Sequence, residues 1–114
     1  MTDLPTRFTL LLLAGTLFAA AGQILFKIGA SGREDISSFF NPWILGGLVA
    51  YALGTLLWIY ALSKVRLTVV YPFTALTFVL VYLFGSLILH EPTTTKALFG
   101  VALVLGGLFL ISTA

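Results

Sequence analysis

Residues 43–62, WILGGLVAYALGTLLWIYAL, form an apolar run without one charged side chain. A helix needs about 20 such residues to cross the hydrocarbon core of a bilayer, which is about 30 Å thick. Only helices and closed barrels satisfy their backbone hydrogen bonds in lipid, and barrel strands alternate apolar with polar side chains. Because this run does not alternate, it predicts a transmembrane helix.

Similar runs flank this one, so we expect helices over about 8–29, 43–63, 68–90 and 95–113 within a single domain, 1–114. Hydrophobic residues make up 60% of the 114 residues, and charged residues make up only 9%. A soluble domain of this size cannot bury so much apolar surface. The expected fold class is therefore an all-α membrane protein with four transmembrane helices.

The first run also has features of a secretory signal peptide, because Arg7 precedes an apolar stretch with small residues near its end. The apolar pattern continues through QILFK, 23–27, beyond the point of the expected cleavage. This continuation favours a helix that stays in the protein.

Short connections leave no room for a domain outside the membrane. Asn-Pro-Trp at 41–43 predicts a capped helix start with an interfacial aromatic ring, and the threonines at 93–95 are N-cap candidates for the last helix. Tyr71–Pro72 lies one turn into the third helix, where proline costs little. Any function must therefore lie inside the membrane or at its two faces.

The positive charges do not orient the chain strongly. Arg7, Lys64 and Arg66 are expected on one side of the membrane, and the other three basic residues on the opposite side. The loop with Lys64 and Arg66 is purely basic, which favours cytoplasmic termini and contacts with anionic lipid headgroups. The equal counts leave dual topology open.

Several classes of function are not supported by the composition. The chain has no cysteine and a single histidine, so neither thiol chemistry nor a metal site is expected. It contains no nucleophile relay, no phosphate-binding glycine loop and no basic cluster for nucleic acid. We therefore expect no enzyme, no cofactor and no nucleic-acid partner.

His90-Glu91-Pro92 ends the third apolar run. One interpretation is a plain helix end at the headgroups, where proline stops the helix and the charges reach water. The other is a carboxylate that binds a cationic group of a substrate.

Gln23 and Lys27 lie four residues apart, so they share one face of the first helix. Lys27 is either a lysine that snorkels to the interface or an ammonium group that binds a lipid phosphate. Gln23 either offers a hydrogen bond to the same substrate or joins two helices.

Tyr51 and Trp58 are seven residues apart and share a face of the second helix. They predict either a cavity wall or, together with Tyr71, part of an aromatic belt at the membrane interfaces.

Gly100 and Gly107 lie two turns apart on one face of the last helix, which favours a dimer contact over packing within one protomer. Gly15, Ala19 and Gly22 form a similar small face on the first helix, for which both uses stay open.

The stretches AAAGQILFK (19–27), LLWIYALSKVRLTVVYPFTALTFV (56–79) and LHEPTTTKALFGVALVLGGLFLI (89–111) resemble small four-helix members of the drug/metabolite transporter superfamily. In particular, the chain is similar to the subunits of the flippase for 4-amino-4-deoxy-L-arabinose linked to undecaprenyl phosphate. It also resembles the small multidrug resistance exporters, which have the same four-helix plan. Those exporters rely on a glutamate in the first helix, and Ala19 occupies that position here.

The resemblance to the flippase implies roles for the polar residues. Lys27, with Arg66 as a second candidate, is expected to bind the phosphate of a polyprenyl-phosphate lipid, and Glu91 the amine of its sugar, oriented by His90. Gln23, Tyr51, Trp58 and Tyr71 complete the expected substrate-binding set.

The implied assembly is a homodimer, or a heterodimer with a related four-helix subunit, in the bacterial inner membrane, where it serves lipid A modification. Two alternatives stay open: a homodimeric exporter of small cations that uses Glu91, and a non-transporting subunit that stabilises a partner.

Overall fold

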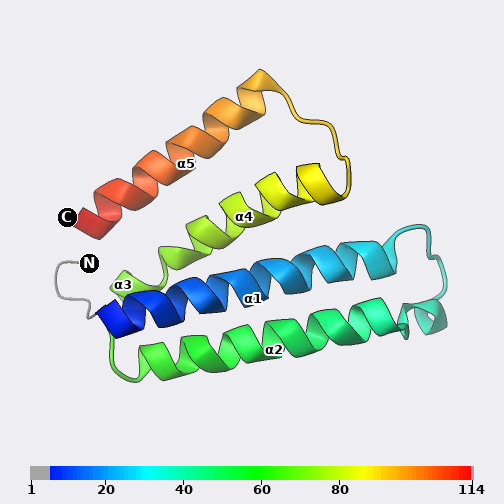
Figure 1. Ribbon diagram of the computed structural model, residues 1–114, viewed down its shortest axis with the longest axis horizontal. Coiled ribbons are helices and arrows are strands. Elements are labelled where there is room, and N and C mark those ends of the chain that lie inside the picture. Colours follow the sequence, from blue (N-terminus) through cyan, green and yellow to red (C-terminus); the bar gives the residue numbers. More distant parts are fainter. Residues whose placement is uncertain (1–5, 114) are drawn as a thin grey trace.

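The computed structural model describes residues 6–113, and every regular element in that range is helical. Figure 1 shows the long helices α1 (Thr6–Ala30), α2 (Pro42–Leu62), α4 (Phe73–Ile88) and α5 (Thr95–Thr113), with the short 3-10 helix η1 (Ile36–Phe39) and the short helix α3 (Leu67–Val70) between them. Together, α3 and α4 form one apolar span, Leu67–Ile88, so four spans within residues 6–113 are long and apolar enough to cross a membrane. The all-helical fold class with four membrane spans is therefore confirmed.

The third span is not the continuous helix over 68–90 that the sequence predicts. It is interrupted at Tyr71–Pro72, because Pro72 has no N–H to donate to the preceding turn. The chain compensates with tighter bonds, in which the N–H groups of Thr74 and Ala75 donate to the carbonyls of Tyr71 and Pro72 at 2.9 and 3.0 Å.

Asn41 caps α2 as predicted. Its Oδ1 accepts hydrogen bonds from the backbone N–H groups of Trp43 and Ile44, at 3.0 and 3.1 Å. Its Nδ2 also donates to the carbonyl of Gly29, at 3.1 Å, and so ties the start of α2 to the end of α1. Of the three threonines before α5, Thr94 has the capping role, since its Oγ1 accepts from the N–H of Ala97 at 3.1 Å.

Glycines on α1 and α2 meet and bring the two antiparallel helices close together. A Cβ atom built at Gly47 would lie 3.0 Å from the carbonyl oxygen of Gly22, and one at Gly54 would lie 2.9 Å from that of Gly15. Close backbone approach of this kind is a main route to helix association in lipid. The small face of α1 is thus used within the protomer, a question that the sequence left open.

The remaining helices extend the pair into a flat row (Figure 1). α4 packs against α1, while α5 packs mainly against α4 and buries only 6% of its membrane-spanning window. The molecule measures 46 × 36 × 18 Å, so its thinnest dimension is less than two helix diameters of about 10–12 Å. Such a slab has two broad apolar faces and little interior.

The best-packed region lies where α1 begins, α2 ends and α3 leads into α4. Phe8, Leu12, Ala61, Val70 and Phe73 form a buried cluster there, and Trp58 packs against it. We call this end of the membrane-spanning helices the terminal face, because α1 begins and α5 ends there (Figure 1). It is an edge of the slab and not one of its two broad apolar faces. The opposite face holds the end of α1 and the connection from α4 to α5.

Candidate functional site: an uncharged cavity between α1, α2 and α4

A cavity of about 310 Å³ lies between three helices, beside the glycine contacts of α1 and α2. It exists because α2 and α4 both pack against α1 but make no comparable contact with one another. The described residues that line it are Gly15, Thr16 and Ala19 of α1, Tyr51, Gly54, Thr55 and Trp58 of α2, and Thr74 and Thr77 of α4. None of these residues carries a charge.

Four threonines contribute polar atoms to a wall that is mostly apolar. Each hydroxyl donates its hydrogen to a carbonyl three or four residues earlier in the chain, at 2.7 Å for Thr16, 2.9 Å for Thr55, 2.8 Å for Thr74 and 3.4 Å for Thr77. A hydroxyl has one donor hydrogen and two acceptor lone pairs. Thr16 is only 1% exposed, so the accessible oxygens are those of Thr55, Thr74 and Thr77, and with their hydrogens engaged they can only accept a hydrogen bond from a ligand.

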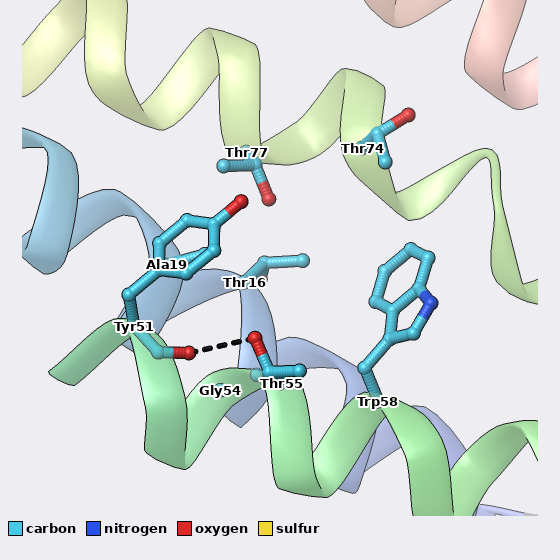
Figure 2. Close-up of a pocket in the computed structure, with 9 residues that line it drawn as sticks. Thr16, Ala19, Tyr51, Gly54, Thr55, Trp58, Thr74 and Thr77 are labelled. Atoms are coloured by element: carbon cyan, nitrogen blue, oxygen red, sulfur yellow. Dashed lines mark hydrogen bonds between the residues drawn. The ribbon is translucent and has the colours of Figure 1, made fainter. Parts of the chain in front are cut away.

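Tyr51 and Trp58 form the aromatic part of the wall, and the prediction that they share a cavity face is confirmed. In Figure 2 the tyrosine hydroxyl points toward Thr77, and the indole lies below Thr74. The phenol and indole groups add hydrogen-bond donors to a wall of acceptors. Their role in binding stays a prediction.

Sequence reasoning missed the four threonines. The available signal was the pairing of glycine with threonine, because Thr16 follows Gly15 and Thr55 follows Gly54 in otherwise apolar helices. A glycine marks a close helix contact, and the polar residue beside it faces the edge of that contact.

Most of the charged candidates lie away from this cavity. Lys27 is exposed on the last turns of α1, eight residues or about 12 Å of helix beyond Ala19. Gln23 is likewise exposed and is not among the residues that line the cavity.

His90 and Glu91 follow the end of α4, on the same face as Lys27 (Figure 1). His90 has a φ of 56°, the left-handed conformation that commonly ends a helix. The Glu91 carboxylate turns back over the last turn of α4, where its Oε1 would lie 3.8 Å from a Cβ atom at Gly85. The helix-end interpretation of His-Glu-Pro is therefore confirmed, and a binding role for Glu91 remains untested.

Arg66 and Tyr71 lie at the terminal face, on either side of α3. The length of α2, 21 residues or about 30 Å, separates this face from the one that holds Lys27. Both residues are exposed. The structure therefore does not bring Lys27 and Arg66 together around one phosphate.

The glycines of α5 make no close contact within the described part of the chain. A Cβ atom at Gly100, Gly106 or Gly107 would meet nothing within 4 Å. Packing within the protomer, the alternative use of the Gly100 and Gly107 face, is thus wrong. A dimer contact at this face stays a prediction.

Four apolar spans in the described chain, arranged around an uncharged cavity, define a small multi-pass membrane protein. The chain belongs to the EamA-like transporter family, whose profile matches residues 4–113. This confirms the resemblance to the drug/metabolite transporter superfamily, and it identifies a transporter family rather than an enzyme family.

Curated relatives match along nearly their whole length. The chain is 32% identical over 106 residues to the probable 4-amino-4-deoxy-L-arabinose-phosphoundecaprenol flippase subunit ArnE of Pseudomonas fluorescens (strain Pf0-1), which covers 89% of this chain and 93% of that protein. It is 34% identical over 107 residues to the protein of the same description from Aeromonas salmonicida (strain A449), with 89% and 94% covered. The corresponding values for Klebsiella pneumoniae (strain 342) are 31% over 105 residues, with 90% and 94% covered. No solved structure matches the chain.

Proposed function

We propose that this protein is one subunit of a flippase that moves a polyprenyl-phosphate-linked aminosugar, such as undecaprenyl-phosphate aminoarabinose, across the bacterial inner membrane for lipid A modification. The observation that carries this proposal is the similarity to probable flippase subunits over about nine tenths of the chain. The structure supports it with an uncharged cavity, lined by threonine and aromatic side chains, halfway along the membrane-spanning helices.

The chemistry of the cavity argues against the alternative of a proton-coupled cation exporter. Such an exporter needs a buried carboxylate that either a proton or the cation can occupy. Here Ala19 lies in the cavity wall, and no carboxylate is among the described residues that line the cavity. The exporter interpretation predicts cation resistance that is lost in Glu91→Gln, and the flippase interpretation predicts no such resistance.

The flat shape of the protomer supports a second subunit. A slab 18 Å thick cannot surround a lipid head group by itself, because its cavity opens between α2 and α4. A second four-helix subunit, related or identical, would cover this opening and contact the Gly100 and Gly107 face of α5. The polyprenyl tail then stays in the surrounding lipid, while the sugar of the head group passes through the covered cavity.

The separated basic residues fit two ends of one path. Lys27 binds the phosphate at one membrane face and Arg66 binds it at the other, one after the other. The cavity lies between these faces, since Ala19 and Trp58 are each eight residues from the corresponding basic residue. Glu91, on the Lys27 face, binds the amine before or after the crossing.

Transport can be measured in vesicles that contain the chain, alone and with a related four-helix subunit. The assay follows the rate at which the amine of an undecaprenyl-phosphate aminopentose becomes accessible to a membrane-impermeant amine reagent. We expect Lys27→Ala to slow this rate at least tenfold, because the loss of a charged hydrogen bond costs about 1.5–3 kcal/mol.

Lys64→Ala is the matched control, since it removes the same charge from an exposed loop position that is expected to contact bulk anionic lipid and is not among the proposed substrate-binding residues. Full transport rates in both Lys27→Ala and Glu91→Ala would show that these site assignments are wrong. If the two subunits together transport no lipid but still stabilise a partner protein, the alternative of a non-transporting subunit would be favoured.

A further inference from the structure

We propose that the cavity between α1, α2 and α4 binds the sugar ring of the transported lipid, in uncharged form, and leaves both the phosphate and the tail outside. This inference rests on the proposed function and adds to it which part of the substrate enters the cavity. It follows from the hydrogen-bonding state, the charge and the size of the cavity.

The hydrogen-bonding groups of the wall suit a polyhydroxylated ring. Thr55, Thr74 and Thr77 present acceptor oxygens only, because their hydrogens are bound to carbonyls three or four residues earlier in the chain. Sugar hydroxyls and a neutral amine supply the matching donors. The Tyr51 hydroxyl supplies a donor for the lone pairs of the same sugar groups.

The aromatic side chains suit the other surface of a sugar. The C–H groups on one face of a sugar ring form an apolar patch, and an aromatic face with its partial negative charge attracts such C–H groups. Tyr51 and Trp58 stand about two turns apart on one wall of the cavity (Figure 2). A ring bound between them would reach the α4 threonines opposite.

Charge decides which form of the head group can enter. An isolated charge in the centre of a membrane costs at least about 2.5–3.5 kcal/mol. A cation–π contact with a desolvated aromatic ring returns about 2 kcal/mol or more, but the described residues of the lining offer no carboxylate to complete the compensation. The cavity therefore favours the sugar with its amine unprotonated over the ammonium form, and it offers no cation to a phosphate.

The volume limits the ligand to one ring. A cavity of about 310 Å³ lies at the lower end of the range of about 300–1,000 Å³ for ligand sites. A long polyprenyl chain needs no such site, because the lipid already solvates it.

Trp58 provides a direct measurement of binding. The chain has two tryptophans, so Trp43→Phe leaves Trp58 as the only one. This variant, full-length in lipid nanodiscs, is titrated with the methyl glycoside of an aminopentose, that of the plain pentose, and tetraethylammonium. Concentrations run to about 100 mM, because so small a ligand is expected to bind with a Kd on the order of millimolar.

We expect both glycosides to change the Trp58 emission with saturation and tetraethylammonium to leave it unchanged. Thr55→Val and Thr77→Val keep the shape of the side chain and each weaken glycoside binding about tenfold. Thr113→Val is the control and changes nothing, because its hydroxyl also bonds to its own helix but lies outside the cavity.

Two results of the titration would overturn the inference: no response to either glycoside, or a response to tetraethylammonium alone. A failure of the proposed function is distinct, since it would appear as glycoside binding without any lipid transport in the vesicle assay. In that assay, lipid transport at full rate in the Thr55→Val, Thr77→Val double variant would also overturn the sugar site and keep the flippase.

Discussion

His90 ends α4 with a backbone φ of 56°, a conformation that costs a residue with a side chain about 1–2 kcal/mol. Glycine adopts it freely, at a smaller entropic cost. We therefore expect His90→Gly to raise the free energy of unfolding by about 0.5–1 kcal/mol, as measured by reversible unfolding in mixed micelles.

His90→Ala is the matched control for this effect. It removes the imidazole but keeps the unfavourable backbone, so it gives no increase in stability. Equal stabilities of the two variants would contradict the backbone explanation. Loss of lipid transport in both variants, with the fold intact, would instead show that the imidazole acts on the substrate.

Individual residues differ in how far the sequence reveals them. The Asn41 cap was predictable, because asparagine before Pro-Trp satisfies the free N–H groups at a helix start from the same short segment. The left-handed His90 was not, because glycine rather than histidine normally marks such a helix end. The position of His90 shortly before Pro92 predicted only that the helix ends there.

Two glycines of α2 that differ in their contact with α1, Gly54 and Gly46, can be compared. A Cβ atom at Gly54 would lie 2.9 Å from a backbone oxygen, which cannot move aside easily. A Cβ atom at Gly46 would lie 3.8 Å from the Leu25 side chain, an ordinary contact. We expect the free energy of unfolding of Gly54→Ala to fall about 2 kcal/mol below that of Gly46→Ala, the usual cost of overpacking.

Both substitutions gain the same helix propensity from alanine, about 1 kcal/mol, so their difference isolates the helix contact. Unfolding in mixed micelles measures it. Stabilities of Gly54→Ala and Gly46→Ala that agree within error would show that α1 and α2 do not meet at these glycines.

The sequence predicted the long helices but not their pairing. An apolar run of about 20 residues is enough to predict a span, because length and apolar side chains are what a helix needs to cross the hydrocarbon core. Which glycine meets which is a property of two helices together, and no single-helix pattern contains it. For the same reason Tyr51 and Trp58 could be placed on one face, while the gap between α2 and α4 that makes them a cavity wall could not.

At the scale of the whole molecule, the α5 glycines offer a test of subunit pairing. Gly100, Gly106 and Gly107 have open space around them, so a larger side chain leaves the protomer intact. Only Gly107 continues the face of Gly100, since seven residues make almost two full turns. We expect Gly107→Leu to reduce co-purification of a related four-helix subunit at least tenfold.

Gly106→Leu adds the same side chain one residue away, on a different face of α5, and serves as the matched control. It is expected to leave co-purification unchanged. Equal loss in both variants would point to a general effect on α5, and no loss in either would exclude the Gly100 and Gly107 face as the contact.

The thin slab also bears on how freely this sequence can change. Most of each described span is not buried inside the protomer, and lipid accepts any apolar residue of suitable length, so large parts of each helix can change in sequence without loss of the architecture. Identities of only 31–34% to curated relatives of nearly equal length are what such a permissive solvent allows. Evolutionary constraint then concentrates in the few places where protein meets protein or substrate, and a saturation mutagenesis map should display those places as narrow stripes.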